Sequence, residues 1–122
     1  MALRASAELR RGQVVNLGIG IPTLVADHLP ADRGVILHSE NGILNYGSHS
    51  DEDFGNPYII NARGEKISSR PGTAIISHND AFAIARSGLL DVAVLGALQV
   101  SGKGDLANWS IPAKGIGSPG GA

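Results

Sequence analysis

The chain has 122 residues, with ten basic and eleven acidic side chains, no cysteine and 43% apolar residues. This length fits one domain or part of one, and the apolar share is enough for a buried core. The balanced charge argues against nucleic-acid binding or an anionic membrane surface, and the lack of cysteine excludes disulfides and thiolate chemistry. No apolar stretch approaches the roughly 20 residues of a membrane span, so we expect a soluble, cytoplasmic protein.

The first third of the chain predicts alternating helices and strands. An amphipathic helix is expected over residues 2–11, and a buried strand over residues 14–19. A second helix follows over residues 23–29, with Pro22 suited to its first position, and a second buried strand over residues 35–38. Short connections between strand, helix and strand favour a parallel strand pair and an α/β architecture.

The same order of elements recurs further along the chain. A polar, turn-rich surface loop is expected over residues 46–57 and a strand over residues 73–76. A helix over residues 79–87, with Ser77 or Asn79 as its N-cap, precedes a strand over residues 90–95.

The end of the sequence is rich in turn residues. Residues 101–122 contain six glycines and two prolines and little apolar sequence. Two interpretations stay open: a disordered tail, or a chain cut within a longer domain. The sequence Leu106-Ala107-Asn108-Trp109 favours the second interpretation, because it is typical of packed structure.

Glu40 gives the strongest local signal of chemistry. It directly follows a predicted buried strand and precedes Asn41-Gly42, a pair that tolerates positive φ. A carboxylate is thus expected on a sharp turn at the carboxyl end of a strand, the edge at which open α/β sheets bind ligands. Such a glutamate can act as general base, covalent nucleophile or ribose ligand, or it can be a solvated turn residue.

Other motifs are weaker. Gly18-Ile19-Gly20 lies between a strand and a helix, but the third glycine of a dinucleotide-binding loop would fall at Thr23. The four histidines have no metal-ligand spacing, so no metal site is expected.

Two segments resemble the second (B or β) subunit of the family I CoA-transferases. They are Ser39-Glu40-Asn41-Gly42-Ile43-Leu44 and Asn16-Leu17-Gly18-Ile19-Gly20-Ile21-Pro22-Thr23. The resemblance continues through Gly104-Asp105-Leu106-Ala107-Asn108-Trp109 to Gly120-Gly121-Ala122 and covers essentially the whole chain. It implies a three-layer α/β/α, Rossmann-like fold with an open, mainly parallel sheet. Residues 1–122 would then be the N-terminal part of a single β-subunit domain, so the fold would be incomplete.

The resemblance also implies an activity and a set of site residues. The Glu40 carboxylate would form a glutamyl-CoA thioester while CoA moves between an acyl-CoA, such as succinyl-CoA, and a short 3-oxoacid of the kind used in ketone-body metabolism. The Gly121 N–H would stabilise the oxyanion. Three further roles are implied: Asn41 and Gly42 shape the turn beside the substrate and CoA pocket, and side-chain amides line or brace the cleft, namely Asn61, Gln99 and Asn108.

The implied partners and cofactors follow from the same family. CoA is a substrate, and no cofactor or metal is permanently bound. An α subunit completes the CoA site in an α2β2-like heteromer, and no contact with nucleic acid or membrane is expected. Without the rest of the subunit, this chain is expected to be marginally stable alone.

Departures from the family sequence leave alternatives open. Asn45, Arg63 and Ser87-Gly88-Leu89 stand where the family has other residues, and Asn45 is expected to reshape the acyl pocket. The acceptor could therefore be 3-oxoadipate, or the acetate or butyrate of an acetoacetate CoA-transferase. A catalytically inactive truncated remnant and a sugar-phosphate isomerase are the rival functions, although no cluster of basic residues is present to hold a phosphate.

Overall fold

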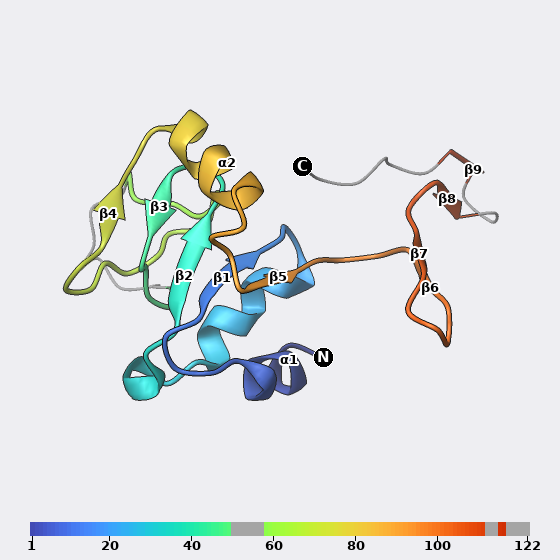
Figure 1. Cartoon of the computed structure of the whole chain (residues 1–122), viewed down its shortest axis with the longest axis horizontal. Helices are drawn as coiled ribbons and strands as arrows, with labels where there is room; N and C mark the ends of the chain where they lie inside the picture. Colours follow the sequence, from blue (N-terminus) through green and yellow to red (C-terminus); the bar gives the residue numbers. More distant parts are fainter. Residues whose placement is uncertain (50–57, 112–114, 117–122) are drawn as a thin grey trace.

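The computed structural model describes residues 1–49, 58–111 and 115–116. Its main feature is a five-stranded sheet with the strand order β4-β3-β2-β1-β5 (Figure 1). The strands are β1 Val14–Leu17, β2 Ile36–Ser39, β3 Ile43–Leu44, β4 Ala74–Ile75 and β5 Val92–Val94.

The directions of the strands follow from the lengths of their connections. β1 is parallel to β2 and to β5, and helical segments connect these strands in the sequence. β3 follows β2 after the short turn at residues 40–42, so it is antiparallel to β2, and β4 is antiparallel to β3. Only β3 therefore runs against the other strands of this sheet, which confirms the predicted open and mainly parallel α/β arrangement.

Helices lie on both faces of the sheet. Leu37 of β2 belongs to the apolar core below α1 and η1, whereas the neighbouring His38 bonds to Ala81 of the helix α2 on the opposite face. This alternation is the period of a β-strand and makes three layers (Figure 1). The helices are α1 Ala2–Glu8, the 3₁₀ segments η1 Ile21–His28 and η2 Ala31–Arg33, and α2 His78–Arg86.

The N-terminal helices differ in detail from the sequence prediction. α1 ends at Glu8 rather than at residue 11, because Leu9 turns into extended backbone and is buried in the core. The second helix begins at Ile21 and is a 3₁₀ helix, with a proline in its first turn.

The core lies between the sheet and the layer of α1 and η1. Its side chains come from β1, β2 and β5 and from the two helices, and Val15 and Leu37 are completely buried. In the described part of the chain, no helix is both long and apolar enough to cross a membrane.

The second half of the sheet matches the predicted order of elements. β4, α2 and β5 lie within the predicted segments or one residue from them, and Ser77 is the N-cap of α2. The loop predicted over residues 46–57 lies partly outside the described residues.

The remaining strands form an arm that stands apart from the main sheet (Figure 1). β6 Gln99–Val100 pairs with β7 Leu106–Ala107, and β8 Ser110–Ile111 pairs with β9 Gly115–Ile116. The region predicted to be loop-like therefore contains hairpins. The expectation that residues 106–109 are packed is wrong for this chain alone, since the Trp109 side chain is 85% exposed.

Candidate active site

Glu40 lies where the sequence places it, immediately after the last residue of β2. β2 lies between β1 and β3, so its position within the sheet is fixed on both sides. The chain then reverses in a tight turn, closed by the Gly42 N–H, which donates to the Ser39 carbonyl at 3.0 Å. Glu40 is partly exposed at this edge, so its carboxylate is reachable by a ligand.

Gly42 allows the turn to lie against the segment that leads into α2. Its φ is +104°, and a Cβ built there would lie 2.3 Å from the Ile76 carbonyl oxygen. The Ile76 N–H donates to the Gly42 carbonyl at 2.9 Å, so the two backbones are in direct contact. Only glycine meets both requirements, which supports the predicted turn-shaping role of Gly42.

Ser39 and Asn41 fasten the other side of the turn. The Ser39 hydroxyl donates to Asn41 Oδ1 at 2.6 Å and accepts from the Ala62 N–H at 3.1 Å. The Asn41 amide donates from Nδ2 to the Ile60 carbonyl at 2.7 Å. Both ends of the Asn41 side chain thus bond within the protein, which suits a bracing role.

Asn61 braces the adjoining turn with its whole amide. It is 6% exposed, and its Oδ1 accepts from the Arg63 and Glu65 N–H groups at 2.9 and 3.0 Å. Its Nδ2 donates to Glu65 Oε2 at 2.9 Å. The amide therefore supports the loop that contacts Ser39. In this arrangement it braces the cleft rather than lining it.

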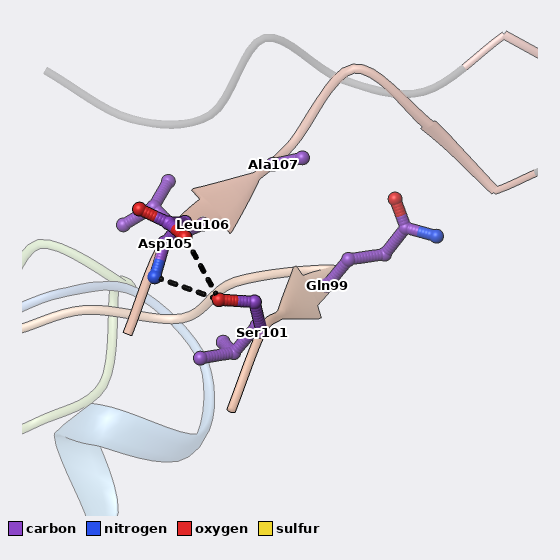
Figure 2. A pocket seen from close by; sticks show the side chains of 6 residues that line it. Gln99, Ser101, Asp105, Leu106 and Ala107 are labelled. Carbon is purple, nitrogen blue, oxygen red and sulfur yellow. Dashed lines mark hydrogen bonds between the residues drawn. The ribbon is translucent and has the colours of Figure 1, made fainter. Parts of the chain in front are cut away.

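Gln99 and Asn108 lie on the arm, and the structure does not bring them beside Glu40 (Figure 1). Asn108 Oδ1 accepts from the Leu98 N–H at 2.9 Å, so this amide braces the hairpin. Gln99 is exposed and lines a shallow hollow of the hairpin (Figure 2). Gly121, the predicted oxyanion donor, lies outside the described residues.

The same hollow contains a serine–aspartate turn. Ser101 Oγ accepts from the Asp105 N–H at 3.1 Å and donates to Asp105 Oδ2 at 3.0 Å (Figure 2). These bonds close the hairpin between β6 and β7 and leave both side chains exposed.

Sequence reasoning missed one feature near Glu40. His38 is fully buried and bonds to Asn16 of β1 and to Ala81 of α2. Burial lowers the pKa of His38, while the bond to the Ala81 carbonyl and the charge of Glu40 act in the opposite direction. The available signal was a polar residue within each of two otherwise apolar strand segments, at positions 16 and 38.

Asn45, which was expected to reshape the acyl pocket, is engaged in a turn. Its φ is +54°, and its Nδ2 donates to the Pro71 carbonyl at 3.1 Å. Its carbonyl accepts from the Thr73 hydroxyl at 2.9 Å. Asparagine is one of the few residues that tolerate this backbone conformation, and here its side chain ties β3 to the loop before β4.

No group of three or more His, Asp or Glu side chains could hold a metal ion within the residues that the structure describes.

Comparison with known proteins supplies the family. The model of the family described as Coenzyme A transferase matches residues 1–121. The second (B) subunit of the 3-oxoadipate CoA-transferase of Pseudomonas putida is 49% identical over 100% of this chain and 57% of its own length. The corresponding B chain of the succinyl-CoA:3-ketoacid coenzyme A transferase of Helicobacter pylori is 45% identical over 98% of this chain and 57% of its own length.

A solved structure agrees with these relatives. An acyl-CoA transferase apoenzyme from Escherichia coli O157:H7 matches with a TM-score of 0.63 and 28% sequence identity, over 95% of this chain and 20% of that one. The chain spans 57% of the length of the two curated relatives. The match of the family model and the identity to these second subunits lead to one conclusion: this chain belongs to the coenzyme A transferase family.

Proposed function

We propose that this chain supplies the nucleophile of a CoA-transferase β subunit, which moves CoA from an acyl-CoA such as succinyl-CoA to a short 3-oxoacid. The observation that carries the proposal is the placement of Glu40. Its carboxylate is partly exposed at the carboxyl end of β2, on a turn held by Ser39, Asn41 and Gly42. The names of the two curated relatives support the same class of reaction.

The first half of the reaction transfers CoA to the protein. A Glu40 carboxylate oxygen attacks the thioester carbonyl carbon, and the C–S bond of the tetrahedral intermediate breaks. This leaves a mixed anhydride and the CoA thiolate. The thiolate then attacks the Glu40 carbonyl carbon and releases the first acid as its carboxylate. The product is a glutamyl-CoA thioester.

The second half repeats these steps in reverse order with the acceptor. The 3-oxoacid carboxylate attacks the glutamyl thioester and again forms an anhydride and a thiolate. The thiolate attacks the acceptor's acyl carbon, and Glu40 is released as a carboxylate. Nucleophile and acceptor are the same functional group, so the steps are nearly balanced in energy and need no redox partner.

Each attack produces a tetrahedral oxyanion that needs hydrogen-bond donors. One such backbone donor is worth about 3–4 kcal/mol of barrier. We assign this role to the Gly121 N–H by its position in the family sequence. Asn41, Gly42 and Asn61 brace the cleft, while Gln99 and Asn108 reach it only if the arm folds toward Glu40 in the assembled enzyme.

The proposed enzyme is a heteromer. An α subunit completes the CoA site, in keeping with the naming of the relatives as one of two kinds of subunit. CoA is a substrate, not a resident cofactor, and the assembly is expected in the cytoplasm.

The acceptor acid has a second candidate. The Pseudomonas putida relative is named for 3-oxoadipate, a longer dicarboxylate. Steady-state rates with acetoacetate and with 3-oxoadipate, each measured with succinyl-CoA, separate the two. A preference for 3-oxoadipate by an order of magnitude in kcat/KM would assign the chain to the second acceptor.

Chemical trapping tests the nucleophile. The full protein, with its partner subunit, is incubated with acetoacetyl-CoA and then with borohydride, which reduces a thioester to an alcohol. Peptide mass mapping is expected to find the reduced side chain at Glu40 and an unmodified peptide in Glu40→Gln. Glu65→Gln is the matched control, because this partly exposed carboxylate braces a loop outside the proposed chemistry. An unmodified Glu40 in a folded, partnered sample would leave the inactive remnant as the better explanation.

A further inference from the structure

Two polar side chains lie side by side at the centre of the sheet, and the proposed chemistry does not use them. Asn16 of β1 and His38 of β2 are direct partners in the parallel register. His38 is fully buried, and Asn16 is only 8% exposed. Burying such groups lowers stability unless they are hydrogen-bonded, and a pair of aliphatic residues would fill the same space without that cost.

Their hydrogen bonds connect three elements. His38 Nδ1 lies 2.8 Å from Asn16 Oδ1, which joins β2 to β1. His38 Nε2 lies 3.0 Å from the Ala81 carbonyl oxygen, which joins β2 to α2. Ala81 is itself completely buried, so the contact with α2 is sealed from solvent.

The chemistry of these partners fixes the proton on one ring nitrogen. The Ala81 carbonyl can only accept, so Nε2 carries a proton. A neutral ring then has a lone pair on Nδ1, and the Asn16 amide must turn its NH₂ toward it; a charged ring would face Oδ1 instead. Burial lowers the pKa of His38 and favours the neutral ring.

Both elements that His38 connects also define the Glu40 turn. β2 continues directly into Glu40, two residues after His38. The segment entering α2 contacts the turn from the other side, through the bond from the Ile76 N–H to the Gly42 carbonyl. A change in the distance between β2 and α2 would therefore move the Glu40 carboxylate relative to the sheet edge.

We infer that Asn16 and His38 are positioning residues that hold β2 against α2 and thereby set the place of Glu40. Neither side chain touches the reacting atoms. Their effect on turnover rests on the proposed function of Glu40, whereas their effect on the turn does not. Displacing a nucleophile by about 1 Å can reduce a rate about 100-fold, so a small shift is enough to matter.

Three variants of the full protein with its partner subunit test this inference. His38→Leu removes both hydrogen bonds but keeps a side chain of similar size. His38→Gln retains one donor and one acceptor on a carboxamide. Val15→Ala is the control, because Val15 is equally buried on β1 but points into the apolar core on the opposite face.

Each variant is measured by amide hydrogen exchange over residues 39–42, by kcat and KM, and by thermal unfolding. We expect His38→Leu to speed exchange of the turn about tenfold or more. Its kcat should fall about 10- to 100-fold with KM little changed. His38→Gln should recover most of both losses. Val15→Ala should lower the unfolding temperature while leaving turn exchange and kcat near those of the wild type.

The inference is overturned if turn exchange in His38→Leu equals that of the wild type, or if Val15→Ala loses as much kcat at an equal loss of stability. Should His38→Leu not fold, ¹⁵N NMR of the wild-type ring decides, because a proton on Nδ1 in place of Nε2 contradicts the geometry. A wild type that forms no Glu40 thioester refutes the proposed function alone, since the exchange measurement still tests the positioning.

Discussion

At Gly42 the backbone adopts a φ of +104° while its carbonyl accepts a hydrogen bond from Ile76. Two separate constraints act on this residue: the backbone conformation and the approach of the Ile76 carbonyl. The first would tolerate asparagine at some cost, but the second leaves no space for any side chain. The nucleophile turn is thus held by backbone contacts that a change of substrate would not alter.

Replacing Gly42 tests this constraint. Gly42→Ala is expected to lower the free energy of unfolding by at least about 2 kcal/mol, because strain at positive φ adds to a clash with backbone that cannot rotate away. Gly12→Ala is the control, since Gly12 has a φ of +83° and a Cβ placed there would meet nothing within 4 Å. It should cost only about 1 kcal/mol. Chemical denaturation measures both, and equal losses would show that the Ile76 contact exerts no constraint.

The buried ring of His38 predicts a pH dependence of stability. Burial lowers its pKa in the folded state from the ordinary 6.5, so the unfolded chain takes up a proton at a higher pH than the native chain does. The unfolded state therefore binds more protons just below pH 6.5, and stability falls as the pH decreases through this range. Above it, the His38 contribution is constant.

Comparing the wild type with His38→Gln isolates this effect from the other titrating groups. The difference in free energy of unfolding between the two should change with pH below about 6.5, with a slope of at most about 1.4 kcal/mol per pH unit. Denaturation curves between about pH 5 and 8 provide the measurement. Parallel pH profiles would mean that His38 takes up a proton as readily in the folded state as in the unfolded chain.

Among the elements, α2 shows which local signals the sequence contains. The Ser77 hydroxyl accepts from the Asp80 N–H at 3.1 Å and donates to the Asp80 carboxylate at 2.7 Å. This satisfies one of the otherwise unpaired N–H groups of the first turn and places a negative charge at the positive end of the helix. The cap could be predicted because it depends only on neighbouring residues.

Removing this cap should destabilise the helix by a predictable amount. Ser77→Ala is expected to lower the free energy of unfolding by about 1 kcal/mol, because the Asp80 N–H loses its partner. Ser87, at the other end of α2, donates only to the Ile84 carbonyl in an exposed turn. Ser87→Ala should therefore change stability by less than about 0.5 kcal/mol. A loss at Ser77 no larger than at Ser87 would contradict the capping role.

Longer-range features explain where sequence-based prediction stopped. The strand containing residues 36–39 and the Glu40 turn could be predicted, because apolar runs and turn residues are local signals. The contact of Gly42 with Ile76 and the His38 bond to Ala81 could not, since each joins residues more than 30 positions apart. The hairpins of the arm were missed because their strands are only two residues long and rich in glycine.

The site residues divide in the same way. Glu40 could be placed from its strand and turn alone, and the roles of Asn41 and Gly42 follow from the same local sequence. Asn61 needed the structure, because its amide is used within its own turn. Gln99 and Asn108 rest on the family resemblance, since neither lies beside Glu40 here.

At the scale of the whole molecule, apolar side chains are distributed unevenly. The main sheet has a packed core on the side of α1 and η1, whereas the arm exposes large apolar side chains. These are Leu95, Leu98, Val100, Leu106 and Trp109, with exposed fractions between 43% and 85%. Exposed apolar surface of this kind marks a region that contacts another surface in an assembled protein. The proposed heteromer would provide such a surface.

Trp109 allows that expectation to be measured, because it is the one tryptophan of the sequence. At 85% exposure, its fluorescence in the isolated chain should have the emission maximum of a solvated indole and be fully accessible to a neutral quencher such as acrylamide. Adding the α subunit should shift the emission to shorter wavelength and reduce quenching, since burial removes the indole from water. Trp109→Phe supplies the background from the partner's own tryptophans. A Trp109 signal that stays solvated in a complex shown to be assembled would mean that the arm is not part of the subunit interface.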